Sequence, residues 1–143
     1  QAGSPSATKL IARAFGKGKK SERSKAMEMA DKWFSQFIRL RDAGEDGRVK
    51  CVTCSHTDHW LYLQCGHYVT RGHMATRFDE RNSNAQCRGC NYNGGKHLKH
   101  AIAIDDKYGD GTSDMLEQKG LTRCSRTLSD LQFMAKLMGV IFM

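Results

Sequence analysis

The stretch CRGCN, from Cys87 to Asn91, decides how this chain folds. It contains the CxxC pair Cys87 and Cys90. An earlier pair, Cys51 and Cys54, lies in VKCVTC, with 32 residues between the two pairs. Two cysteines three positions apart in a tight turn present both sulfurs to one tetrahedral ion. Together the two pairs predict a site in which four thiolates hold one Zn²⁺.

Four protein ligands fill the coordination sphere of zinc, so this ion is expected to be structural and not catalytic. It would stabilise a small, loop-rich centre that buries too little apolar surface to be stable alone. Two disulfides are the alternative, and a reducing intracellular environment disfavours them. The remaining cysteines, Cys65 and Cys124, are interpreted as buried or unused thiols.

The hydrophobic pattern divides the 143 residues into four segments, as expected for one folded unit with a tail. These are a basic flexible tail (1–21), an amphipathic helix (22–46), a central core (47–109) and a C-terminal helical extension (110–143). In the second segment, apolar residues recur every three or four positions and predict a helix over roughly 22–42.

The central segment predicts a small α+β fold. VKCVTC predicts a tight knuckle, WLYLQC (60–65) is the most β-prone run, and residues 70–86 predict a polar, Arg-rich loop. After CRGCN, the pattern predicts a helix that begins between Gly94 and His97 and ends before Gly109.

Two further helical patterns follow, around 113–119 and from about 127 to the end of the sequence. The second has an apolar stripe at helical spacing, which consists of Leu128, Leu131, Met134, Met138 and Ile141. We interpret this stripe as core or as a dimer contact.

The chain is basic, with 23 Lys and Arg against 15 Asp and Glu and a net charge of +8. Such a charge favours a polyanionic partner, most commonly nucleic acid. Residues 1–25 hold seven basic side chains and one acidic one, which suits both a solvated tail and a phosphate-binding arm. No apolar run approaches the roughly 18 residues of a membrane span, and the N-terminal sequence lacks a signal peptide's apolar region. We therefore expect an intracellular protein with no membrane partner.

Three polar residues stand out near the second cysteine pair. His67 ends QCGH, Asn82 lies five residues before Cys87, and Asn91 directly follows Cys90. This arrangement resembles the His-Asn-Asn form of the HNH (ββα-metal, His-Me finger) endonuclease motif. FIRLRD, CVTC, CGHYV, RFDERNSNAQCRGCN and the following GGK more closely resemble the lambdoid-phage NinG (Rap) recombination nucleases, over roughly 33–109.

The resemblance implies a zinc-stapled ββα-metal (HNH) core with flanking α-helices. It also implies a Mg²⁺- or Mn²⁺-dependent endodeoxyribonuclease in the cytoplasm of a bacterial host. Its substrates would be branched recombination intermediates, such as Holliday junctions and D-loops, cut to leave 3′-hydroxyl and 5′-phosphate ends. A homodimer is attractive because a junction must be cut on two strands.

The residues themselves suit this chemistry. Phosphodiester hydrolysis needs a base for the attacking water and a cation near the scissile phosphate. The imidazole of His67 suits the base, and the amide oxygen of Asn91 suits a ligand of catalytic Mg²⁺. Asn82 is interpreted as an outer residue that hydrogen-bonds across the loop to hold His67 in its working orientation.

One position departs from the commonest HNH pattern, because Gly66 stands where many members carry a metal-binding Asp before the base. We expect Mg²⁺ to be held mainly by Asn91 and waters, with Asp79, Glu80 or His73 as alternative further ligands. The candidate DNA-binding side chains are Arg71, Arg77, Arg81, Lys17, Lys19 and Lys20. The remaining histidines are expected on the surface or facing DNA, namely His56, His59, His97 and His100.

Two other functions remain open from the sequence. The first is a non-catalytic zinc-ribbon module that binds DNA and recruits recombination partners. The second is a sequence-specific HNH nuclease of the homing or restriction type. The binding module predicts DNA binding without cleavage under any divalent metal and no effect of Asn91→Ala. The sequence-specific nuclease predicts that linear duplex is cut as readily as junctions.

Overall fold

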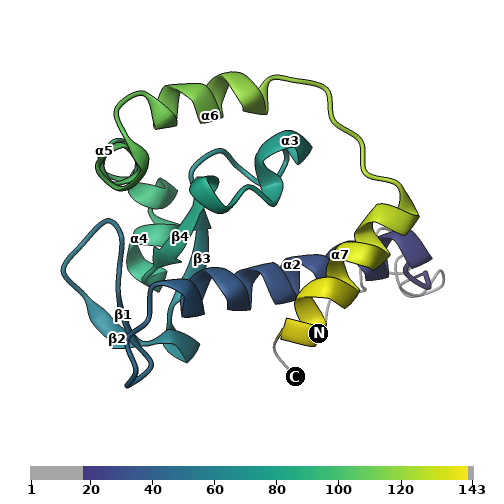
Figure 1. Cartoon of the computed structure of the whole chain (residues 1–143), viewed down its shortest axis with the longest axis horizontal. Coiled ribbons are helices and arrows are strands. Elements are labelled where there is room, and N and C mark those ends of the chain that lie inside the picture. Colours follow the sequence, from purple (N-terminus) through teal and green to yellow (C-terminus); the bar gives the residue numbers. More distant parts are fainter. Residues whose placement is uncertain (1–17, 142–143) are drawn as a thin grey trace, which may run out of the picture.

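A computed structural model describes residues 18–141 of the chain. Its longest helix, α2 (Glu22–Arg41), runs along one side of the molecule, and the strands and α4 (Arg88–Tyr92) gather at its C-terminal end (Figure 1). Most of the predicted tail (1–21), including Lys17, lies outside the described residues. Over residues 18–141, no helix has the length and hydropathy that a membrane span requires.

Helix α2 confirms the amphipathic helix expected over 22–42. Ser21 caps it by accepting a hydrogen bond from the backbone N–H of Ser24, and Arg39 and Arg41 lie in its last turn, where cations are favoured. One face is buried along its whole length, and it consists of Ala26, Ala30, Phe34 and Ile38.

Helix α7 (Leu128–Ile141) packs along the N-terminal half of α2, as Figure 1 shows. Leu131 is fully buried there and Ala135 is nearly so. At Gly139, an added Cβ would lie 3.2 Å from Nε1 of Trp33, so the two helices approach closely. Within the stripe predicted from the sequence, Leu131 is buried and Leu128, Met134 and Met138 are partly buried, which favours core among the two interpretations.

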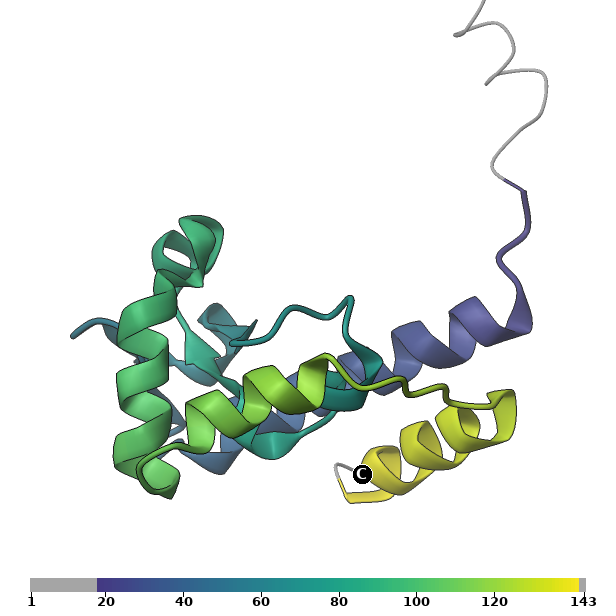
Figure 2. The same cartoon turned by 90° about the horizontal axis from the view of Figure 1, so that it is seen from above.

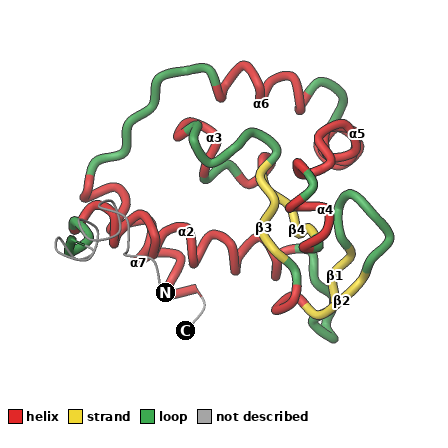
Figure 3. The backbone as a smooth tube through the Cα atoms, turned by 180° about the vertical axis from the view of Figure 1, so that it is seen from behind, coloured by secondary structure: helices red, strands yellow, loops and turns green. Residues whose placement is uncertain are grey.

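Two small antiparallel sheets lie beside α2 (Figure 3). In the first, β1 (Arg48–Lys50) pairs with β2 (Thr57–His59). In the second, β3 (Gln64–His67) pairs with β4 (Ser83–Gln86), so that His67 lies opposite Ser83. Because α4 directly follows β4, the second sheet and this helix form a β-β-α unit.

The run WLYLQC is only partly a strand, so the sequence prediction was wrong for its first half. Trp60–Tyr62 form the 3-10 helix η1, in which the side chain of His59 accepts a hydrogen bond from the N–H of Leu61. Tyr62 is 73% exposed, whereas Leu63 is 3% exposed. The apolar residues thus serve to turn the chain and bury Leu63 rather than to extend a sheet.

The segment 70–86 is more ordered than the expected loop, because it contains α3 (Met74–Arg77), the 3-10 helix η2 (Glu80–Asn82) and β4. Strand β4 is buried although three of its four residues are polar. Hydrogen bonds offset part of this burial: Asn84 Oδ1 accepts from Arg41, and Gln86 Nε2 donates to Thr53 Oγ1 and to the carbonyl of Gly95. The Oε1 atom of Gln86 is buried without a hydrogen-bond partner among residues 18–141.

The remaining helices cover the other side of the β-β-α unit. After the 3-10 helix η3 (Gly94–Lys96), α5 (His97–Tyr108) and α6 (Thr112–Gly120) confirm the two expected helices. Figure 2 shows α6 leading from the end of α5 back across the molecule.

His100, on α5, is 1% exposed and hydrogen-bonds to the side chain of Asn84. The expectation that His100 lies on the surface or faces DNA is therefore wrong. Burial lowers its pKa to about 4, so this imidazole is a neutral part of the core at pH 7.

Gly66 offers a test of how tightly the second sheet is packed. A Cβ at this position would lie 2.3 Å from Oε1 of Gln86, and the Gln86 side chain is fixed by its two hydrogen bonds. We expect Gly66→Ala to lower the free energy of unfolding by roughly 1–3 kcal/mol. Urea denaturation measures this, with Gly89→Ala as the control, because nothing lies within 4 Å of a Cβ there. Equal losses in the two variants would contradict the packing described.

Candidate active site and metal centre

The four cysteines of the two CxxC pairs come together as the spacing predicts. The sulfur atoms of Cys51, Cys54, Cys87 and Cys90 all lie within 4.8 Å of one another, and those of Cys54 and Cys87 are 3.8 Å apart. A tetrahedral ion with Zn–S bonds of about 2.3 Å separates its sulfurs by about 3.8 Å. The cluster is thus arranged so as to be able to hold a zinc ion.

Backbone N–H groups point at three of these sulfurs. The N–H of Cys87 donates to Cys51, that of His56 to Cys54 and that of Cys90 to Cys87. Burial opposes ionisation of Cys51, but the hydrogen bonds from Cys87 and Thr53 lower its pKa to about 6. At Cys54, the N–H of His56 favours the thiolate, yet burial and the neighbouring thiols raise the pKa to about 12. A bound divalent cation would favour the thiolate form of all four cysteines.

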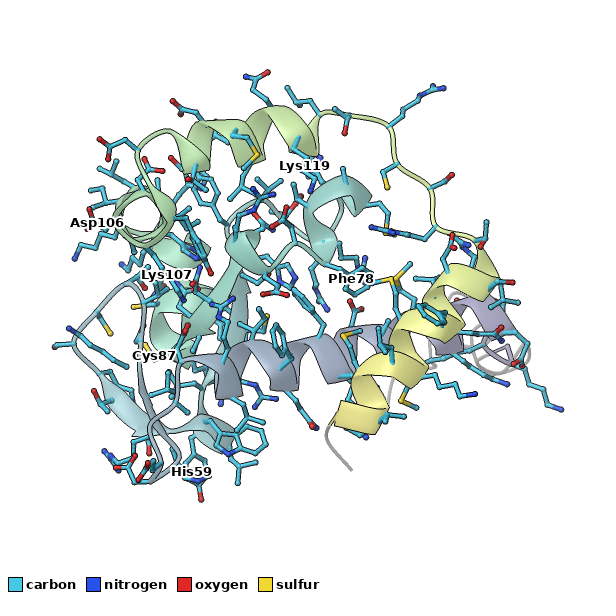
Figure 4. The ribbon with its side chains drawn as sticks, in the orientation of Figure 1. His59, Phe78, Cys87, Asp106, Lys107 and Lys119 are labelled. Carbon is cyan, nitrogen blue, oxygen red and sulfur yellow. The ribbon has the colours of Figure 1, made fainter. Side chains whose placement is uncertain are left out.

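The cysteine cluster also organises the β-β-α unit. Cys51 and Cys90 are buried in one apolar cluster with Val49, Leu63 and Ala85, which come from β1, the turn before β3, and β4. Cys87 is the N-cap of α4, and Figure 4 shows it near the C-terminal end of α2. The position of α4, and hence of Asn91, therefore depends on the sulfur cluster.

A cavity of about 660 Å³ lies between α2, β3, the loop after β3 and the N-terminus of α5. His67 and Asn91 both line it, although they are 24 positions apart in the sequence. Its other lining residues are Asp31, Ser35, Arg39, Leu63, Gln64, Cys65, Tyr68, Thr70, Arg71, Gly94, Gly95 and His97. The structure thus brings together the predicted base and the predicted metal ligand.

His67 is held by one hydrogen bond of 3.0 Å between its Nε2 and the carbonyl oxygen of Arg77. A carbonyl oxygen only accepts, so Nε2 carries the proton and Nδ1 has the lone pair in the neutral ring. No residue between 18 and 141 hydrogen-bonds to Nδ1. Burial lowers the pKa of His67 to about 4, against the effect of the Arg77 carbonyl, which raises it. The ring is therefore neutral at pH 7.

Asn91 lies on α4 and donates from Nδ2 to Oε1 of Gln64, at 2.8 Å. This bond fixes the orientation of the amide, and no other residue of the described chain bonds to its oxygen. A single neutral oxygen in a water-accessible cavity suits an ion such as Mg²⁺, which keeps most of its waters. The donor set at this position therefore fits a hard cation with few protein ligands.

Asn82 is fully buried and acts on the backbone rather than on the ring of His67. Its Oδ1 accepts from the N–H of Val69, and its Nδ2 donates to the carbonyls of Val69 and Thr76. The sequence interpretation had Asn82 hydrogen-bonding across the loop, and its bonds to Val69 and Thr76 do so. Among residues 18–141, the ring of His67 itself bonds to the carbonyl of Arg77. Asn82 closes the loop that ends beside this carbonyl.

The three alternative Mg²⁺ ligands do not line the cavity. Asp79 forms ion pairs with Arg81 and Lys119, at 2.8 and 2.7 Å, and Figure 4 shows Lys119 on α6 near α3. Partial burial opposes ionisation, but these two cations hold the pKa of Asp79 well below its ordinary value. Glu80 is exposed, and His73 Nδ1 bonds to the carbonyl of Gly120. Their side chains are directed to other parts of the fold.

The candidate DNA-binding side chains differ in whether they line the cavity. Arg71 lines the cavity with its side chain 61% exposed, which suits a phosphate contact. Arg77 is 17% exposed and paired with Asp31, and Arg81 is paired with Asp79 away from the cavity. Lys19 is exposed, and Lys20 forms an exposed ion pair with Glu28.

Several lining residues were not found by sequence reasoning. Asp31, Ser35 and Arg39 lie four residues apart on α2 and form a polar stripe that faces the cavity. Their spacing was visible, but only the apolar stripe beside it was used. His97, expected on the surface or facing DNA, is 60% exposed and also lines the cavity, and its ring stacks on that of Tyr68 with the centroids 4.4 Å apart.

Comparison with known families identifies the family of this chain. The family described as Bacteriophage Lambda NinG protein matches residues 9–136. This match spans the cavity, the cysteine cluster and nearly all of the described elements. No curated protein and no solved structure matches the chain significantly.

The cysteine cluster can be tested by metal analysis. We expect the purified protein to contain about one zinc ion per chain and Cys87→Ser to lose most of it. The variant should also lose several kcal/mol of unfolding free energy, because zinc binding contributes directly to folding. Elemental analysis and thermal denaturation measure both effects. Cys124→Ser is the control, because Cys124 is exposed and outside the cluster. Zinc content unchanged in Cys87→Ser is the contrary result.

Proposed function

The chain belongs to the bacteriophage lambda NinG family, and from this membership and the cavity geometry we propose that it is a metal-dependent DNA endonuclease acting on branched recombination intermediates. The observation that carries the proposal is the presence of His67 and Asn91 in one cavity. One is a neutral imidazole with a free Nδ1, and the other is an amide whose oxygen has no partner among the described residues.

In the proposed reaction, Nδ1 of His67 accepts a proton from the water that attacks the scissile phosphorus. The bond between this water oxygen and phosphorus forms while the bond to the 3′ oxygen breaks. The 3′ oxygen takes a proton from solvent water, which leaves a 3′-hydroxyl and a 5′-phosphate. The hydrogen bond from Nε2 to Arg77 supports the imidazolium that forms, because the carbonyl dipole favours the cation. A ring with a pKa of about 4 is fully available as a base at pH 7 but is a weak one.

The weakness of this base makes a cation necessary. When bound, Mg²⁺ or Mn²⁺ would neutralise charge on the scissile phosphate and the leaving oxygen. Asn91 would hold this ion, and Gln64 would keep the amide of Asn91 oriented. The zinc cluster would act indirectly, by fixing the position of α4, the helix that carries Asn91.

Selectivity for branched DNA, including Holliday junctions and D-loops, is proposed from charge and family. The net charge of +8 supports contact with several phosphates. Arg71 is the exposed cation at the cavity and would contact the phosphate nearest the cut. Lys17, Lys19 and Lys20 would contact phosphates on a second arm, and a homodimer would place two cavities on one junction.

Cleavage of a matched substrate panel tests the proposal. We expect the parent protein to cut a labelled four-way junction and a D-loop with Mg²⁺, and linear duplex of the same sequence much more slowly. His67→Ala and Asn91→Ala should reduce the rate roughly 10²–10⁴-fold, as loss of a base or metal ligand does. His56→Ala and Asn93→Ala are matched controls, because neither side chain lines the cavity. Zinc content is measured in each variant.

Three outcomes would contradict the proposal in different ways. Junction binding without cleavage under any divalent metal would support the zinc-ribbon binding module. Equal cleavage of linear duplex would support a sequence-specific nuclease. Full activity of a folded, zinc-loaded His67→Ala protein would remove His67 as the base.

The pH dependence of kcat/KM provides a second prediction, because this ratio reports the ionisation of the free enzyme. Burial lowers the pKa of His67 to about 4, so the base stays unprotonated as the pH falls through 6.5. The acid limb should therefore lie roughly between pH 4 and 5.5, well below the ordinary histidine value of about 6.5. Zinc content is checked at each pH. An acid limb near 6.5 with zinc retained would contradict the buried environment of this ring.

A further inference from the structure

Helix α2 contributes a charged side chain to the cavity that the reaction above does not use. Asp31 lines the cavity, and its side chain is only 18% exposed. It comes from outside the β-β-α unit and lies more than thirty positions before His67 in the sequence. A partly buried carboxylate needs compensation by a cation or by hydrogen bonds.

The compensation comes from Arg77, which binds both carboxylate oxygens. Arg77 Nε donates to Oδ1 at 3.0 Å, and Nη2 donates to Oδ2 at 2.5 Å. Such a two-point arginine–carboxylate pair fixes direction as well as distance. Nη1 of the same guanidinium donates to the carbonyl of Arg71, at 3.0 Å. The Arg77 side chain is thus held at three points, between α2 and the loop after β3.

The backbone of this same arginine holds the ring of His67. The carbonyl of Arg77 accepts the hydrogen bond from Nε2 and so determines which ring nitrogen is free. Arg77 is the last residue of α3, a helix of four residues that cannot hold its own position. Figure 4 shows Phe78, the next residue, above the middle of α2, and its ring packs edge-on against that of Phe34 at 5.5 Å.

We propose that Asp31 is a positioning residue, which acts through Arg77 to hold the carbonyl that orients His67. This inference rests on the proposed function for its catalytic consequence, but the placement of the ring is a property of the free protein. Both oxygens of Asp31 already accept from Arg77, and Arg71 Nη1 lies 3.9 Å from Oδ2. The carboxylate is therefore committed to arginine and is not a metal ligand in this arrangement.

The charges around His67 fit this role. Arg71 and Arg77 both disfavour the imidazolium, whereas Asp31 favours it. Asp31 thus offsets the two guanidinium groups at the place where positive charge would form during proton transfer. Removing it would leave two uncompensated cations beside the ring and would remove the anchor of the Arg77 side chain, so that the carbonyl is held less firmly.

Variants of the ion pair test the proposal. Asp31→Asn keeps the shape of the side chain but removes its charge, and Arg77→Met removes the guanidinium while leaving the backbone carbonyl. Both are combined in a double variant. Asp42→Asn is the matched control, because Asp42, the C-cap of α2, also forms ion pairs, with Arg41 and Lys107, and does not line the cavity.

The first readout is the tautomer of His67, from the nitrogen chemical shifts of its ring in the zinc-loaded protein without DNA. We expect the parent and Asp42→Asn to show one tautomer with the proton on Nε2. Asp31→Asn and Arg77→Met should show a mixture of tautomers. This readout requires no activity, so it tests the positioning of His67 even if no DNA is cut and the proposed function fails.

The second readout is junction cleavage. Asp31→Asn and Arg77→Met should each lower kcat roughly 10- to 100-fold, as a small displacement of a base does, with KM changed less than about twofold. The double variant should lose no more than either single variant, because the two side chains act as a unit. An unchanged tautomer in folded Asp31→Asn overturns the proposal, and so do additive losses in the double variant.

Discussion

Four sulfur atoms held within 4.8 Å of one another are the constraint on which the rest of the central fold depends. The strands beside them have only three or four residues each, and neither two-stranded sheet could be stable alone. The cluster joins the turn after β1 to the end of β4 and begins α4. A cation there would replace the apolar core that this part of the chain is too short to build.

Helix α2 holds the parts of the central fold that lie away from the cysteine cluster. Arg41, at its C-terminal end, donates to the carbonyls of Glu80 and Ser83 and to Asn84, and so anchors the buried polar strand β4. Asp31, further along the same helix, holds Arg77. The β-β-α unit therefore gets one wall of its cavity, and the support of its histidine, from a helix that precedes it in the sequence.

The sequence predicted the parts that depend on local spacing. The four cysteines, α2 and the later helices follow from periodicity and ligand spacing, which are visible in one chain. Strand β4 was missed because its buried residues are polar, and their partners, such as Arg41 and Thr53, lie far away in the sequence. The pairing of Asp79 with Arg81 and Lys119 could not be predicted for a related reason. Charge indicates that a residue can bind a ligand, but the sequence does not show which opposite charge the fold places beside it.

The cavity is notable for having no uncommitted carboxylate among its described residues. Gly66 has no room for an aspartate, because an added Cβ would lie 2.3 Å from Oε1 of Gln86. Asp31 is paired with Arg77. For an endonuclease of the proposed kind, this arrangement has a consequence: free protein offers a hard cation only neutral oxygens, so its affinity for Mg²⁺ should be low. The phosphate oxygens of DNA would supply the missing negative charge, and binding of substrate and of metal would then depend on each other.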